Sequence, residues 1–235
     1  MYIYFLIKKL YFCVVLYSKQ GRNTMKSYLF DFDGTLVDSM PAFIKTMLRI
    51  LDENGIEYGD DIVKIITPLG YAGTARYYIE LGVPMTEGEI MSKMTEYALD
   101  EYAYRIEAKE SVISTLNALK ARGYSLNVLT ASPHSMLDPC LKRLGIFDLF
   151  DNVWSCDDFG TTKADPNIYK MAAERMGTTV DEVIFIDDNS NADKTAKSAG
   201  MIVGGIYDKS SEDCVDSIKE ITDFYIYDFS ELLEL

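Results

Sequence analysis

The chain contains the stretch Tyr28-Leu29-Phe30-Asp31-Phe32-Asp33-Gly34-Thr35-Leu36-Val37-Asp38-Ser39, in which two carboxylates follow an apolar run. The apolar residues are typical of a buried parallel strand. Side chains alternate along a strand, so Asp31 and Asp33 are expected to lean the same way at its end. Such a pair suits a divalent metal ion, or a nucleophile beside an acid/base group. A strand that ends in a solvated, Asp-rich turn would have the same sequence pattern. The interpretation therefore depends on whether other chemically active residues elsewhere in the chain meet this pair.

Strands and helices alternate in the second half of the chain, after a long helical region. Helical periodicity without an intervening strand covers about residues 40–107. Alternating strands and helices predict right-handed βαβ units in a parallel sheet. We therefore expect an α/β, Rossmann-like parallel sheet covered by helices on both faces, with an inserted all-helical region. The strands expected after the first are Tyr124–Leu129, Asn152–Ser155, Glu182–Ile186, Met201–Ile206 and Phe224–Tyr227.

Turn and capping signals divide the helical region. Leu69-Gly70-Tyr71-Ala72-Gly73-Thr74 contains two glycines and is predicted to be a loop after Pro68. The residues Thr86-Glu87-Gly88-Glu89 form a capping pattern, which predicts a helix over Thr86–Tyr104. Later in the chain, a helix is predicted over Ser211–Ile221.

Length and charge limit the classes of function. The 235 residues are enough for one domain with a sizeable insertion, or for two small domains. The net charge of −14 argues against binding to nucleic acid or to an anionic membrane, because both require a basic surface. The cysteines, Cys13, Cys140, Cys156 and Cys214, lack CxxC spacing and are expected to be reduced thiols of a cytoplasmic protein. The oligomeric state stays open.

The first 24 residues differ in composition from the rest. They contain no acidic residue and four basic ones, and Lys8-Lys9 separates two apolar runs. Each run is shorter than the roughly 20 residues that a membrane span requires. We expect residues 1–24 to be a non-native or disordered leader, without stable membrane insertion, and the functional chain to begin at Met25. A peripheral membrane anchor is the competing hypothesis. The expected domains are an α/β core of residues 25–39 and 108–235, and a helical insertion of residues 40–107.

Ligands of an open α/β sheet bind beyond the carboxyl ends of its strands. Several chemically active side chains are expected to meet at this edge. Crowded carboxylates require a cation, and Mg²⁺ with retained waters is the natural choice. A hydroxyl and backbone N–H groups at a strand end suit a phosphate group. The residues concerned are Asp31, Asp33, Thr130, Lys163, Asp187 and Asp188.

Four segments of the chain carry the polar residues expected at the sheet edge. They are Asp31-Phe32-Asp33-Gly34-Thr35, Leu129-Thr130-Ala131-Ser132, Lys163 with Asp165-Pro166, and Ile186-Asp187-Asp188-Asn189. In this order they resemble the motifs of the haloacid dehalogenase (HAD) superfamily, and the resemblance covers residues 27 to about 230. The helical insertion is similar to the C1-type cap of subfamily I, which includes phosphoglycolate phosphatases and β-phosphoglucomutases.

The resemblance implies a role for each matched residue. Asp31 would attack phosphorus and form an aspartyl-phosphate, while Asp33 would protonate the leaving alcohol and then activate water. Mg²⁺ would be held by the Asp31 carboxylate, the Asp33 backbone carbonyl and Asp188. Asp187 would support these ligands without binding the metal itself. Thr130, the Ala131 N–H and Lys163 would bind the phosphate. The expected enzyme is a Mg²⁺-dependent phosphoric monoester hydrolase acting on a small phosphorylated metabolite.

Three alternative functions stay open. A 2-haloacid dehalogenase expels a halide without protonating it, so the acid at Asp33 argues against that activity. A β-phosphoglucomutase carries a histidine twelve residues after its nucleophile, where this chain has Phe43. A degenerate, non-enzymatic phosphate-binding module has no need of the complete set of catalytic residues.

The chain also departs from the family pattern. Thr162 and Ala164 flank Lys163, where the third motif usually reads Gly-Lys-Pro. The fourth motif often has Asp or Asn four residues after its metal ligand, but here that residue is Ala192. Its neighbours Asn191 and Asp193 are both candidates to take over that role, and neither is assigned to the site. His134 is expected at a surface helix start. Tyr71, Arg76 and Arg49 are candidates to contact the far end of a substrate, although a packed tyrosine or a solvated arginine is the preferred interpretation of each one.

Overall fold

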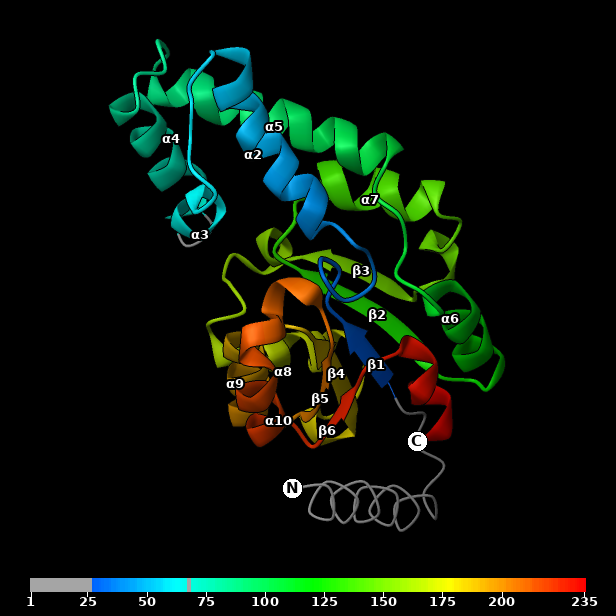
Figure 1. Cartoon of the computed structure of the whole chain (residues 1–235). Helices are drawn as coiled ribbons and strands as arrows, with labels where there is room; N and C mark the ends of the chain where they lie inside the picture. Colours follow the sequence, from blue (N-terminus) through cyan, green and yellow to red (C-terminus); the bar gives the residue numbers. More distant parts are fainter. Residues whose placement is uncertain (1–26, 67–68) are drawn as a thin grey trace. The chain divides into compact units, whose positions relative to one another are not determined.

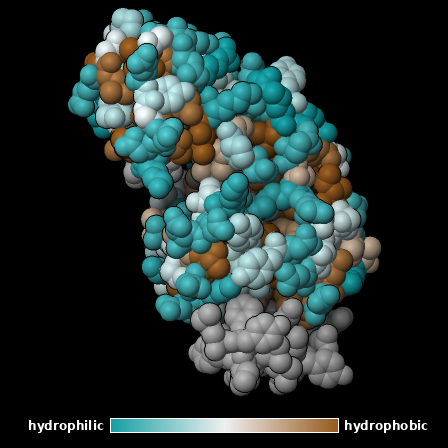
Figure 2. All heavy atoms as spheres, viewed as in Figure 1, coloured by the Kyte–Doolittle hydropathy of each residue, from teal (hydrophilic) through white to brown (hydrophobic). Residues whose placement is uncertain are grey.

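The computed structural model describes residues 27–66 and 69–235 (Figure 1). The predicted leader and Pro68 lie outside the described residues. The chain divides into two compact units, one comprising the described residues up to Asp38 together with Glu107–Leu235, and the other Ser39–Ile106. Hydrophilic residues predominate on the visible face of each unit (Figure 2). None of the described helices is both long and apolar enough to span a bilayer.

The first unit is built on a parallel sheet. Its strand order, among the described residues, is β3-β2-β1-β4-β5-β6, which places β1 between β2 and β4. Every residue of β1 is buried, as expected for a central strand covered on both faces. The strands are β1 (Ser27–Phe30), β2 (Ser125–Thr130), β3 (Asn152–Ser155), β4 (Val183–Asp187), β5 (Ile202–Ile206) and β6 (Phe224–Ile226).

Helices cover both faces of this sheet (Figure 1). Leu29 of β1 and Phe185 of β4 pack in one apolar cluster with α8 and α9. On the other face the ring of Phe30 packs against Phe229, 5.4 Å away between centroids. The predicted fold class is therefore confirmed. The helices of this unit are α6 (Val112–Ala121), α7 (His134–Arg143), α8 (Pro166–Arg175), α9 (Ser190–Ala199) and α10 (Val215–Ile221).

Short 3₁₀ helices connect several of these elements. Because they involve only a few residues each, the hydrophobic pattern did not indicate them. One of them replaces the first part of the helix predicted over Ser211–Ile221, so that prediction was too long at its start. They are η2 (Phe147–Leu149), η3 (Cys156–Phe159), η4 (Val180–Glu182), η5 (Lys209–Cys214) and η6 (Phe229–Glu234).

The second unit is helical. Its apolar cluster is formed by the inward faces of the helices, and the Tyr78 hydroxyl donates a hydrogen bond of 3.1 Å to the Met47 carbonyl within it. The capping box predicted at Thr86 is present, with both reciprocal hydrogen bonds to Glu89. The helices are α2 (Met40–Glu53), α3 (Ile62–Ile66), α4 (Gly70–Glu80) and α5 (Glu87–Tyr104).

The loop predicted over Leu69–Thr74 was wrong, because α4 begins at Gly70. Packing outweighs the low helix propensity of the two glycines. Tyr71 stacks on Phe43 of α2 with 5.9 Å between ring centroids, and the Thr74 hydroxyl donates to the Ile66 carbonyl at 3.3 Å. These contacts join α4 to α2 and to α3, so the pattern within residues 69–74 could not reveal them.

Candidate active site

Asp31 and Asp33 lie at the carboxyl end of β1. The Asp31 N–H donates to the Ile186 carbonyl at 2.9 Å, which continues the β1–β4 pairing by one residue. The chain then turns, and the Phe32 carbonyl accepts hydrogen bonds from Leu36 N at 2.9 Å and Val37 N at 3.1 Å. Phe32 is fully buried, while Asp31 retains 7% exposure. Strand β1 ends at Phe30, so Asp31 extends the pairing with β4 by one residue and Asp33 lies in the turn that follows.

Lys163 contacts two carboxylates that belong to different strands. Its ammonium group forms an ion pair with Asp31 Oδ1 and donates to Asp187 Oδ2 at 2.9 Å. Burial opposes the charged form of this lysine, but the attraction of Asp187 and Asp31 is stronger and raises the pKa of Lys163 well above its ordinary value. The lysine thus provides a fixed positive charge between the ends of β1 and β4.

The carboxylates of Asp31, Asp187 and Asp188 form a cluster that could hold a metal ion. Each of the three offers an oxygen, and these atoms lie within 4.8 Å of one another. Asp187 is fully buried, and its second oxygen accepts from Asn189 N at 2.8 Å, so protein groups already engage both oxygens. Asp188 accepts a longer hydrogen bond of 3.4 Å from Thr35. Asp188 is therefore better suited to bind a cation directly, and Asp187 to orient Lys163.

Two further observations fit a cation at this cluster. Burial, together with repulsion from Asp187 and Asp208, raises the pKa of Asp188 to about 7, which shows how unfavourable its negative charge is without added positive charge. Gly34 has a φ of 75°, and a Cβ at this position would lie 2.7 Å from Asp188 Oδ2. The backbone beside the carboxylate thus approaches as closely as only glycine permits, which leaves this side of Asp188 unobstructed by a side chain.

Thr130 and Ser132 stand at the end of β2. Thr130 is 1% exposed, and its Oγ1 accepts a hydrogen bond of 3.0 Å from Ser132 N, which leaves its hydroxyl hydrogen available as a donor. The Ser132 hydroxyl donates to Asp33 Oδ2 at 2.6 Å. Ala131, between them, is exposed. The loop that follows Thr130 and Ala131 is therefore bonded to the predicted acid/base residue through Ser132.

Asp193 is a buried residue that the sequence did not assign. It belongs to the first turns of α9, is fully buried, and neither of its carboxylate oxygens has a hydrogen-bond partner among the described residues. Burial and the nearby charges of Asp187 and Asp188 raise the pKa of Asp193 well above its ordinary value. Asn191, the other neighbour of Ala192, is exposed. Of the two candidates left open, Asp193 is thus the one next to the acidic cluster.

His134 lies between two carboxylates at the start of α7. Its Nδ1 is 2.8 Å from Asp138 Oδ1, and its Nε2 is 2.8 Å from Asp158 Oδ2. A neutral imidazole has one N–H, so donation to both carboxylates requires the imidazolium form. Accordingly, the two aspartates raise the pKa of His134. The histidine is at a helix start, as expected. In addition, its contacts with Asp138 of α7 and Asp158 of η3 connect the two helices.

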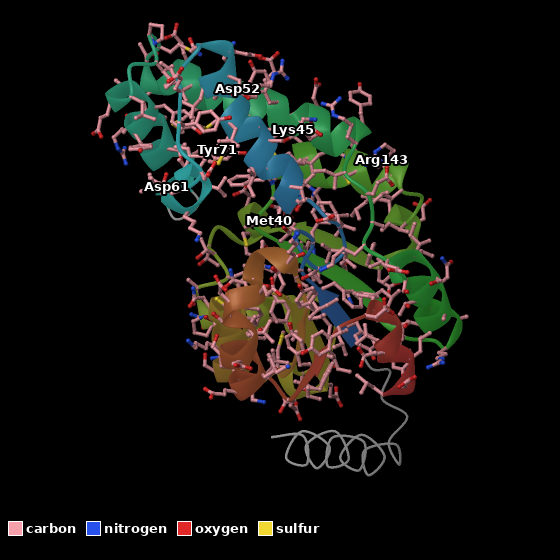
Figure 3. The ribbon with its side chains drawn as sticks, viewed as in Figure 1. Met40, Lys45, Asp52, Asp61, Tyr71 and Arg143 are labelled. Atoms are coloured by element: carbon pink, nitrogen blue, oxygen red, sulfur yellow. The ribbon has the colours of Figure 1, made fainter. Side chains whose placement is uncertain are left out.

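The residues of the insertion proposed to contact substrate form contacts within the insertion itself. Tyr71 packs toward α2, as described above (Figure 3). Arg76 pairs with Glu87 at 3.1 Å. The Arg49 guanidinium lies 3.8 Å from the Tyr97 ring centroid and borders a cavity of about 360 Å³ lined by Lys45, Thr46, Arg49, Glu101 and Arg105.

Comparison with known proteins identifies the family. The model of the family described as "Haloacid dehalogenase-like hydrolase" matches residues 28–206, which is most of the chain. The chain belongs to this family. The resemblance carried by the four motifs is therefore confirmed, and so is the expectation that the protein is an enzyme.

Relatives of this haloacid dehalogenase-like hydrolase include named phosphatases. Pyrophosphatase PpaX of Bacillus velezensis is 30% identical over 179 residues, which covers 76% of this chain and 81% of the relative. Glyceraldehyde 3-phosphate phosphatase of Methanocaldococcus jannaschii is 29% identical over 238 residues, covering 90% and 96%. The structure of a predicted phosphoglycolate phosphatase from Haemophilus somnus 129pt shares the fold, with a TM-score of 0.74, 23% identity, and coverage of 91% and 99%.

Proposed function

We propose that this enzyme is a Mg²⁺-dependent phosphatase that hydrolyses a small phosphomonoester metabolite through an aspartyl-phosphate on Asp31. The observation that supports this most directly is the cluster of Asp31, Asp187 and Asp188 with one lysine between two of its members. Three buried carboxylates and one cation leave an excess of negative charge. Such a site becomes favourable only when further positive charge binds, and then it can accept a phosphate group.

In the first step, a carboxylate oxygen of Asp31 attacks phosphorus and the bond from phosphorus to the ester oxygen breaks. The Lys163 ammonium group lies against Asp31 and can pair with the phosphate oxygens as charge shifts toward them. The Thr130 hydroxyl and the Ala131 N–H at the end of β2 are assigned to the same phosphate oxygens. These groups hold phosphorus in position for attack, so most of the catalysis comes from positioning and electrostatics.

Asp33 transfers protons in both steps. It first gives a proton to the leaving alkoxide, and then takes one from the water that attacks the aspartyl-phosphate. This second attack releases inorganic phosphate and restores Asp31. The 2.6 Å hydrogen bond from Ser132 fixes the orientation of the Asp33 carboxyl group, which suits a group that must reach both the alcohol and the water.

Asp31, Asp188 and the backbone carbonyl of Asp33 would hold the Mg²⁺, and Asp187 would keep Lys163 in place. When bound, Mg²⁺ would offset the repulsion between the carboxylates and the phosphate and polarise the phosphoryl oxygens. Oxygen ligands of this kind are the ones Mg²⁺ prefers. The raised pKa of Asp188 and the close approach of Gly34 support this assignment.

The alternative activities are less well supported. A dehalogenase has no use for an oriented acid at Asp33, and Asp33 is held by Ser132. Phe43, at the position of the mutase histidine, stacks on Tyr71 and offers no proton-transfer group. A binding module without activity would have no need of Asp33 beside an otherwise complete set of residues.

We assign substrate selection to residues 40–107, which would act as a cap. The names of the relatives, which include a glyceraldehyde 3-phosphate phosphatase, support a small phosphorylated metabolite as substrate. A cytoplasmic location is part of the proposal, because the described cysteines Cys140, Cys156 and Cys214 are free thiols, as in a reducing compartment.

Asp31→Asn is the decisive test of the mechanism. With p-nitrophenyl phosphate and Mg²⁺, the variant is expected to lose about 10⁴-fold or more in kcat, because the amide is a far weaker nucleophile. Asp38→Asn, at an exposed position in the same segment, is the matched control and is expected to keep wild-type kcat. Turnover by a folded Asp31→Asn protein at the wild-type rate would refute the assignment. A panel of phosphorylated metabolites would then identify the substrate.

A further inference from the structure

Lys109 lies where the chain re-enters the α/β unit after the insertion. Its backbone N–H donates to the Leu36 carbonyl at 3.0 Å, and two residues earlier the Glu107 carbonyl accepts from Asp38 N at 3.0 Å. An antiparallel bridge joins Val37 and Ala108 between these bonds. The backbone of Lys109 is therefore fixed against the segment that follows Asp31 and Asp33.

The side chain of Lys109 reaches three acceptors from two segments. Its Nζ donates to the Gly34 carbonyl at 2.7 Å, to the Tyr207 carbonyl at 2.6 Å and to Asp208 Oδ2 at 3.0 Å. An ammonium group has three N–H donors, so each finds an acceptor. The side chain is 19% exposed and that of Asp208 is 5% exposed, so water screens the pair only weakly. This arrangement ties the turn after Asp33 to the end of β5.

The position of the Gly34 peptide group matters for the acidic cluster. Gly34 follows Asp33 directly, and its backbone passes so close to Asp188 that a Cβ would contact all three atoms of the carboxylate. Within the turn, the Gly34 N–H donates to the Val37 carbonyl at 3.0 Å. The Gly34 carbonyl is held from outside the turn by Lys109. The Asp33 carbonyl belongs to the preceding peptide group, which shares the Gly34 Cα, so a shift of the Gly34 carbonyl would also move the Asp33 carbonyl relative to Asp188.

The charge of Lys109 also affects the cluster. Asp208, like Asp187, repels the Asp188 carboxylate, whereas Lys109 and Lys163 attract it. Pairing Lys109 with Asp208 thus offsets a buried negative charge near Asp188. Without the lysine, Asp208 and the Gly34 carbonyl would both lose a charged hydrogen-bond donor and be left with a polar group that no longer has this partner.

We propose that Lys109 is a positioning residue of the active site, which acts through the Gly34 carbonyl to set the distance between the Asp33 backbone and Asp188. The inference rests on the proposed function, because these are the groups assigned to Mg²⁺. Lys109 touches neither the phosphate nor the metal ligands' side chains in this role. It holds the turn so that two ligands, one following β1 and the other following β4, face one ion.

The test compares Lys109→Met with Lys109→Arg in the full chain. Mg²⁺ affinity is measured by isothermal titration calorimetry. The parameters kcat and KM are measured with p-nitrophenyl phosphate as substrate. Lys109→Met is expected to weaken Mg²⁺ binding and lower kcat by about 10- to 100-fold each, with little change in KM at saturating Mg²⁺. Lys109→Arg keeps the charge and a donor and is expected to recover part of both losses. Lys197→Met removes a lysine paired with Asp223 in the same unit and serves as the matched control.

Asp208→Asn separates the contact with Gly34 from the ion pair. This variant keeps the bond from Lys109 to Gly34 and is expected to retain more Mg²⁺ affinity than Lys109→Met. Equal losses in the two variants would overturn the proposal, as would wild-type Mg²⁺ affinity and kcat in a folded Lys109→Met protein. If the unpaired Asp208 prevents Lys109→Met from folding, the double variant K109M/D208N removes that charge and is measured instead.

Failure of the double variant to fold would show a purely structural role and overturn the proposal. The calorimetric measurement does not depend on turnover. A wild-type chain that binds Mg²⁺ but hydrolyses no phosphomonoester would therefore refute the proposed function, while the effect of Lys109 on Mg²⁺ binding would still be measured.

Discussion

The Ser132 hydroxyl donates a 2.6 Å hydrogen bond to Oδ2 of Asp33, although the two residues are 99 positions apart in the sequence. The bond joins the loop after β1 to the loop after β2. It orients the carboxyl group that we assign to proton transfer, so the acid/base residue is held in position before any substrate binds.

Ser132→Ala is expected to lower kcat about 10-fold, which corresponds to about 1.4 kcal/mol of transition-state stabilisation. The Asp33 carboxyl group would then be free to rotate away from the leaving oxygen. Steady-state kinetics with p-nitrophenyl phosphate and an alkyl phosphate would measure the loss. Ser198→Ala, on the exposed side of α9, is the control. An unchanged kcat on both substrates would show that the bond has no role in catalysis.

Asp33→Asn is expected to discriminate between leaving groups. An alkyl phosphate expels a strongly basic alkoxide that needs a proton, whereas p-nitrophenolate leaves without one. The loss in kcat/KM is therefore expected to be larger for the alkyl substrate, by about 10-fold or more within the 10²–10⁴-fold range typical of general acid–base catalysis. Equal losses on the two substrates would contradict the acid role.

Asp188→Asn is expected to affect metal binding and stability in opposite directions. It should abolish detectable Mg²⁺ binding and, like chelation by EDTA, stop turnover. The native pKa of Asp188 is raised to about 7, so its carboxylate lowers stability progressively as the pH rises from about 4 to 7. In EDTA, the variant should therefore gain more thermal stability over wild type at pH 8 than at pH 5. A gain in thermal stability that is larger at pH 5 than at pH 8 would contradict the raised pKa of Asp188.

His134 is expected to titrate above its ordinary pKa of 6.5, because Asp138 and Asp158 both face the ring at 2.8 Å. Its contribution to stability is then fully present below pH 6.5 and is lost as the pH rises through the native pKa. The sequence contains one histidine, so a single imidazole NMR signal of the untagged protein reports this pKa. Asp158→Asn should lower it. A value at or below 6.5 in wild type would show that the two contacts do not persist in solution.

Much of the α/β unit could be predicted because buried parallel strands are short apolar runs. The strand predicted over Asn152–Ser155 has the observed bounds, and the other four with predicted bounds differ by one residue at one end or at both. The polar residues at the strand ends could be grouped because parallel strands bring their carboxyl ends to one edge. The contact of Lys163 with Asp31 and Asp187 agrees with that grouping.

Other features depend on contacts that a linear pattern does not contain. Asn191 and Asp193 flank Ala192, and successive residues on a helix differ by about 100° in direction, so sequence alone could not show that Asn191 is exposed while Asp193 is buried near the acidic cluster. Lys109 belongs to no motif, and its acceptors Gly34 and Tyr207 are 75 and 98 positions away. The helix that begins at Gly70 is likewise stabilised by packing on α2 rather than by its own composition.

The hydrogen bond between Asp38 N and the Glu107 carbonyl places the two ends of the insertion next to each other. For the α/β unit, residues 39–106 are therefore one long loop between paired ends, and each doubling of such a loop costs only about 0.6 kcal/mol in closure entropy. An insertion of another length or sequence could replace it at this single junction, with Asp31 and Lys163 left where they are. This junction makes the chain modular, since exchanges at its two adjacent ends, after Asp38 and before Glu107, could replace the insertion while the residues assigned to phosphoryl transfer stay the same.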